Sequence, residues 1–153
     1  MTKSDLLKTA QGLNQVSQEL ADEFSSKRDL LVDLMNQKML ARLDIKDMVG
    51  ENNIEMMKDN HANHARFLES VFYEFHPDVL LDTVLWVFRA YRSRNFSSTY
   101  WAAQLNSWVE IHKENLSDKC FKAIYPYYNW MQINIPSFTT LAEEEIDAPL
   151  SSH

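Results

Sequence analysis

Three of the five histidines are the residues whose type and spacing could support chemistry. His61 and His64 are three positions apart in a segment of helical periodicity, so they are neighbours on one helix face, and His112 lies on the apolar seam of another predicted helix. Three imidazoles that meet inside the fold could bind a metal or a haem, or hold the head of an acidic ligand. The alternative is that each histidine is a core residue hydrogen-bonded to a buried partner.

Established catalytic and metal-binding motifs do not occur in the chain. No Glu-x-x-His pair or His-Glu-x-x-His sequence is present, and Cys120 is the only cysteine. Gly12 and Gly50 are the only glycines, which leaves no phosphate-binding loop and no Gly-x-Ser-x-Gly nucleophile elbow. We therefore expect a protein that is not an enzyme, and the sequence identifies no cofactor.

Aromatic and basic side chains could complete a ligand site around the histidines. Trp101 and Trp108 share a predicted helix with His112, and Arg92 ends the preceding helix, where a guanidinium could bind a carboxylate with two hydrogen bonds. The alternative for the arginine is a local ion pair on the surface. The predicted ligand-binding residues are His61, His64, Arg92, Trp101, Trp108 and His112.

A second cluster of aromatics surrounds Pro126. Residues in a row point in all directions around a helix, so the side chains next to this proline cannot all face inward. They are the predicted exposed interface for a second copy of the chain or for a regulatory protein: Tyr125, Tyr127, Tyr128 and Trp130.

Composition favours an all-α protein. Two glycines and four prolines in 153 residues leave little material for the turns of a sheet. The net charge of -7 opposes a nucleic-acid surface, and the most apolar run, residues 79–88, is too short and too interrupted for a membrane span. With a polar N-terminus and one cysteine, we expect a cytoplasmic protein without membrane or nucleic-acid partners.

Helical periodicity and capping residues predict a single-domain bundle of six to seven helices over residues 1–142, followed by a frayed acidic tail, 143–153. The first helix covers residues 4–24, and a second begins near Ser26, unless residues 4–42 form one long helix. Pro126 predicts a kink or a break in the sixth helix, and Pro136 predicts its end. The remaining predicted helices cover 53–75, 77–94 and about 98–116.

This order of helices in about 150 residues, with a central apolar helix at 77–94 and no catalytic motif, resembles the globin-like sensor domains of bacterial stress and sporulation regulators. The resemblance implies a globin-like fold of the non-haem type, an apolar ligand such as a fatty acid, and pairing into dimers. A haem-binding member would need a proximal histidine, for which His112 is the candidate, but the flanking pattern is missing.

Three hypotheses follow from these features. The first is a non-enzymatic regulatory or sensory module, dimeric as the resemblance implies, that holds a small apolar or acidic ligand near the histidines and tryptophans. The second is a haem- or metal-binding protein that uses the same histidines. The third is an interaction module that binds a partner through the aromatics around Pro126.

Overall fold

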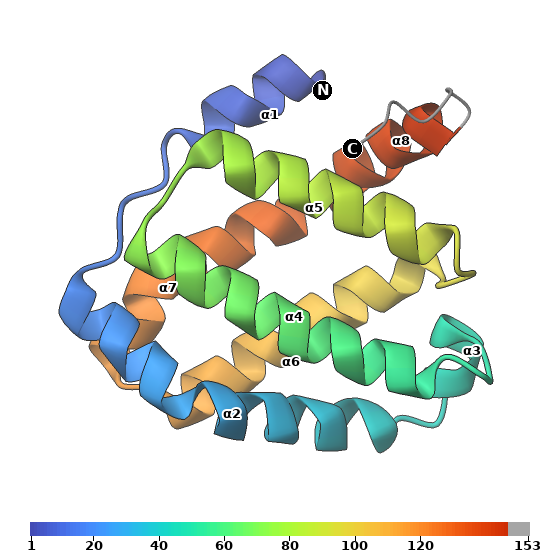
Figure 1. The fold of residues 1–153 in the computed structure, drawn as a ribbon, viewed down its shortest axis with the longest axis horizontal. Coiled ribbons are helices and arrows are strands. Elements are labelled where there is room, and N and C mark those ends of the chain that lie inside the picture. The colour runs from blue at the N-terminus through green and yellow to red at the C-terminus, as the bar shows by residue number, and fades with distance from the viewer. Residues whose placement is uncertain (147–153) are drawn as a thin grey trace.

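The predicted all-α class is confirmed by a computed structural model that describes residues 1–146 (Figure 1). This part of the chain forms eight helices and no strand. The helices are α1 (Lys3–Ala10), α2 (Gln18–Leu40), α3 (Ile45–Val49), α4 (Ile54–Tyr73), α5 (Pro77–Arg92), α6 (Ser98–Asn115), α7 (Asp118–Ile133) and α8 (Ile135–Ile146).

The long helices form two layers. Helices α4 and α5 cross in front of α6 and α7 in Figure 1, while α2 lies along one edge and packs against both α4 and α6. Helix α5 packs mainly against α1 and α8. The largest fully buried side chains lie between these elements and are mostly aromatic: Trp108, Tyr100, Tyr127, Tyr128, Phe24, Phe72 and Phe138.

The N-terminal region differs from its prediction. Helix α1 ends at Ala10, and residues 11–17 leave the helical path before Ser17 caps α2 by accepting a hydrogen bond from the amide of Leu20. Both predicted alternatives, a helix over 4–24 and one helix over 4–42, are therefore wrong. Apolar periodicity continues through the gap because Val16 still faces the core, which hides the interruption from a periodicity search.

The C-terminal helices also differ from the prediction. Helix α7 is continuous through Pro126, so the predicted break is wrong. The proline has no N–H to donate to the carbonyl of Lys122, but both residues are exposed to water. Pro136 lies in the first turn of α8, where a missing N–H is no loss. Helix α8 continues to Ile146, past the predicted domain end at 142, and the rest of the predicted tail lies outside the described residues.

Three of the four predicted interface residues are buried. Tyr127, Tyr128 and Trp130 are exposed by 0%, 1% and 4%, whereas Tyr125 is exposed by 39%. Helix α7 packs against α2, α6 and α8, and the N-terminal segment covers a further side, while the face that carries Tyr125 stays exposed. The Tyr127 hydroxyl donates to the carbonyl of Asn14 at 2.5 Å. The prediction of an exposed aromatic interface is therefore wrong except at Tyr125.

Gln15 attaches the N-terminal segment to the end of α4. Its side-chain amide donates to the carbonyl of Phe72 at 2.8 Å, and its side-chain oxygen accepts from the amide of Phe75 at 2.8 Å. These two bonds join segments about 60 positions apart and satisfy backbone groups where α4 ends. The Gln15 side chain therefore fixes the non-helical segment 11–17 to the end of α4.

Replacement of Gln15 by alanine is expected to lower the free energy of unfolding by roughly 1–2 kcal/mol, because two hydrogen bonds are lost and two backbone groups are left to solvent. Urea titration followed by circular dichroism measures the change. Gln11→Ala, at an exposed position in the same segment, is the matched control. Equal stabilities for the two variants would contradict the role assigned to Gln15.

Candidate functional site

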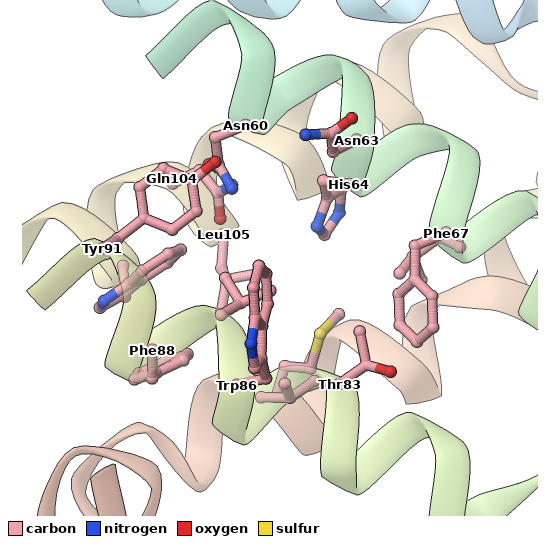
Figure 2. A pocket seen from close by; sticks show the side chains of 15 residues that line it. Asn60, Asn63, His64, Phe67, Thr83, Trp86, Phe88, Tyr91, Gln104 and Leu105 are labelled. Carbon is pink, nitrogen blue, oxygen red and sulfur yellow. Dashed lines mark hydrogen bonds between the residues drawn. The ribbon is translucent and has the colours of Figure 1, made fainter. Parts of the chain in front are cut away.

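A cavity of about 220 Å³ lies between α4 and α5, with α6 and α7 behind it (Figure 2). Residues 74–76 join these two helices, which diverge from this connection instead of packing closely along their length. Fifteen side chains line the cavity: Asn60, Asn63, His64, Phe67, Leu68, Thr83, Val84, Trp86, Val87, Phe88, Tyr91, Trp101, Gln104, Leu105 and Met131.

Helical spacing explains why these side chains share the cavity. The α4 members recur every three or four residues from Asn60 to Leu68 and so lie on one face of that helix. The α5 members, from Thr83 to Tyr91, form the opposite wall. Most of the lining is apolar and none of it is an aspartate, glutamate, lysine or arginine. A molecule in this cavity therefore meets apolar walls and a few uncharged polar groups.

Asn60 and Gln104 form a polar group at one end of the cavity. Both are almost fully buried, and the Asn60 side-chain oxygen accepts hydrogen bonds from the Tyr100 hydroxyl at 2.7 Å and from the Gln104 side-chain amide at 3.0 Å. Burial raises the pKa of Tyr100 well above its ordinary value, so this hydroxyl keeps its proton and donates. Figure 2 shows Tyr91 beside the same end of the cavity.

His64 reaches the cavity from α4 and is hydrogen-bonded on its far side to Tyr128. The Tyr128 oxygen lies 2.8 Å from Nε2 of His64 and 2.9 Å from Nε2 of His112. Both imidazoles lie nearly parallel to the Trp108 indole, with ring centroids 5.0 Å and 5.4 Å away. A single hydroxyl on α7 therefore joins histidines of α4 and α6.

The third histidine, His61, also contacts the Trp108 indole. Its Nδ1 is 2.6 Å from the side-chain oxygen of Asn36, and its ring meets Trp108 edge-on at 6.0 Å. Three buried nitrogen atoms in this group lack a hydrogen-bond partner: Nε2 of His61, Nδ1 of His112 and Nε1 of Trp108. The three histidines thus gather around one tryptophan, but only His64 lines the cavity.

Burial lowers the pKa of His61, His64 and His112 to about 3, and for His64 the other two histidines contribute to this shift. All three imidazoles are therefore neutral near pH 7. Burial also raises the pKa of the Cys120 thiol to about 11, so this cysteine is a structural thiol and not a nucleophile.

The other predicted ligand-binding residues lie in different places. Trp101 lines the cavity, whereas Trp108 is buried behind it. Arg92 is half-exposed and forms an ion pair with Glu143 at 2.6 Å, away from the cavity lining. Sequence reasoning missed Asn60 and Gln104. The signal for Asn60 is a polar residue four positions before His64, on the same face of an amphipathic helix.

A haem or a metal ion finds little support in this geometry. Within residues 1–144, whose side chains the structure describes, no three histidines, cysteines or carboxylates are placed to hold a metal. The cavity is smaller than the roughly 300–1,000 Å³ typical of sites for drug-sized ligands, and only one imidazole lines it. The residues present do not fit a haem.

The neutral histidines predict acid sensitivity. A histidine with a folded-state pKa near 3 and an unfolded-state pKa near 6.5 stabilises the fold fully above pH 6.5, and this stability is lost as the pH falls towards 3. Between pH 7 and pH 5 the expected loss is roughly 2 kcal/mol for each histidine that stays neutral. Denaturant titrations at these two values measure it, and unfolded carboxyls remain mostly ionised over this range.

His76→Gln is the matched control for this measurement because His76 is exposed and outside the histidine group. It should show the same loss of stability as the unmodified protein. A free energy of unfolding that does not change between pH 7 and pH 5 would show that the histidines are not kept neutral.

The chain matches no protein-family model, no curated protein and no solved structure. The resemblance to globin-like sensor domains therefore stays a prediction. No helix in the described part of the chain has both the length and the hydrophobicity to cross a bilayer.

Proposed function

We propose that the protein is a non-enzymatic binding module that holds one small, uncharged, largely apolar molecule between α4 and α5. The observation that carries this proposal is a cavity with apolar walls, no charged lining residue and a buried polar group at one end. Apolar walls supply affinity in such sites, and a few fixed polar groups orient the ligand. The resemblance to sensor domains agrees with a regulatory use of this binding.

The size and charge of the cavity limit the ligand. An apolar cavity of about 150 Å³ is enough for benzene, so 220 Å³ suits a single ring with a substituent. A carboxylate here would be a buried charge without a cationic partner, because Arg92 lies at the surface and is paired with Glu143. Of the two predicted ligand types, an apolar one is supported and an acidic one is not.

Helix α5 supplies a route from ligand binding to a change elsewhere in the protein. It forms one wall of the cavity and also packs against α1 and α8. Trp86 on this helix is 54% exposed although it lines the cavity, so it stands where the cavity opens to solvent. A ligand that displaces α5 would alter the contacts of both terminal helices, where a second copy or a regulatory partner could detect the change.

The lining also supports a binding role over catalysis. His64 is its only ionisable side chain with an ordinary pKa near neutrality, and burial keeps that imidazole neutral. No carboxylate, lysine or cysteine accompanies it, so the cavity offers no pair of groups for general acid and base catalysis. Of the four residues that the interaction hypothesis places at the surface, only Tyr125 is exposed.

A ligand panel tests the proposal. We expect 4-ethylphenol to bind and 4-ethylbenzoate, its charged counterpart, to bind at least tenfold more weakly, because the carboxylate would lose its hydration without gaining a cation. Isothermal titration calorimetry measures both, and Trp86 provides an independent fluorescence signal.

A cavity-filling variant provides the control. Val87→Phe puts a larger side chain into the wall, and we expect at least a tenfold loss of affinity for 4-ethylphenol. Val79→Phe makes the same change on the same helix at an exposed position outside the cavity and should bind normally. Equal affinities in the two variants would place binding elsewhere and contradict the proposal.

A further inference from the structure

The hydroxyl of Tyr128 has one proton and two imidazole partners. Burial raises the pKa of Tyr128 well above its ordinary value, and both histidines are neutral, so the hydroxyl donates a hydrogen bond to one Nε2 and accepts a hydrogen bond from the other. The two imidazoles must therefore be opposite tautomers. The remaining question is which of them accepts the hydroxyl proton.

The surroundings of His112 decide between the two arrangements. Its Nδ1 is buried and has no partner. If His112 accepted from Tyr128, its own proton would be on Nδ1 as an orphaned buried N–H, which is rarer in proteins than an unpaired acceptor. The N–H of Trp108, whose ring stacks on His112, already lacks a partner, so a second orphaned donor would add a penalty of roughly 1–3 kcal/mol. His112 therefore carries its proton on Nε2 and donates to the Tyr128 oxygen.

This arrangement sets the tautomer of His64. The Tyr128 hydroxyl donates to Nε2 of His64, so the imidazole proton is on Nδ1. No described protein group is hydrogen-bonded to this nitrogen, and His64, unlike His61 and His112, is a lining residue that points into the cavity in Figure 2. The cavity therefore contains an imidazole N–H donor.

Asn60 adds a second donor one helical turn away. Its oxygen already accepts from Tyr100 and from Gln104, and its side-chain amide also interacts with Tyr91, so the group it has left for a ligand is the second N–H of that amide. Asn60 and His64 are four residues apart and lie on the same face of α4.

We propose that the ligand is a carbonyl compound, such as an aryl ketone, whose oxygen accepts hydrogen bonds from Nδ1 of His64 and from the side-chain amide of Asn60. This assignment rests on the proposed binding function and names the ligand class of the same cavity. Tyr128 and His112 are positioning residues, because they act through the tautomer of His64.

The tautomers can be measured without a ligand. In protein labelled with ¹⁵N histidine, His64 should show a protonated Nδ1 and His112 a protonated Nε2 at pH 7. The reverse assignment would overturn the proposal, because His64 would then offer the cavity an acceptor.

Two probes of nearly equal shape test the ligand class. Acetophenone and α-methylstyrene differ by C=O against C=CH₂, and a purely apolar cavity would prefer the more hydrophobic α-methylstyrene. We expect acetophenone to bind at least tenfold more tightly. Equal binding, or tighter binding of α-methylstyrene, would overturn the carbonyl assignment and leave the binding function standing. If neither compound binds, both proposals fail.

Tyr128→Phe removes only the hydroxyl and should reduce the preference for acetophenone to threefold or less, because the tautomer of His64 is no longer set. Tyr125→Phe is the same substitution at an exposed position of the same helix and should keep the full preference. An unchanged preference in Tyr128→Phe would contradict the positioning role. If this variant does not fold, the ¹⁵N measurement on the unmodified protein still decides the tautomers.

Discussion

The hydrogen bonds of the Tyr128 hydroxyl connect α4, α6 and α7 at the centre of the protein. Buried imidazoles are tolerated only while they are neutral and mostly hydrogen-bonded, so these bonds restrict how the three helices can shift relative to one another. Hydrogen bonds therefore hold the back of the cavity in place. His64 is held by Tyr128 from behind, and Asn60 is held by Tyr100 and Gln104.

The front of the cavity is built differently. Helix α5 contributes mostly apolar side chains and Trp86, and its polar contact with α4 is that of Tyr91 with the Asn60 side chain, at the polar end of the cavity. A fixed polar end and a wall held by apolar contacts suit the capture of a small molecule, because the polar groups keep their geometry while the wall adapts to the ligand. The wall in turn packs against α1 and α8, the first and last helices.

Most of the chain's aromatic side chains lie in the core or around the cavity and not on an exposed surface. Trp108 contacts all three buried histidines, and Phe88 stacks on Trp101 at 4.5 Å along the cavity wall. The buried Tyr127 side chain attaches α7 to the N-terminal segment through its hydrogen bond to the carbonyl of Asn14. Aromatic side chains combine large apolar area with a polar tip, so they can fill a core and still satisfy its polar groups.

The sequence by itself determined the helical class, most of the boundaries of α4 to α7 and the inward position of the histidines, because scarce glycine, apolar periodicity and capping residues are local signals. It also indicated that His64 and Trp101 face the interior. Only the tertiary structure decided that Tyr127, Tyr128 and Trp130 are buried, since burial depends on how many neighbours surround α7. It alone brought Asn60, Gln104 and His64 to one cavity, because that juxtaposition depends on the divergence of α4 and α5 and on the packing of α6 behind them, which no local pattern encodes.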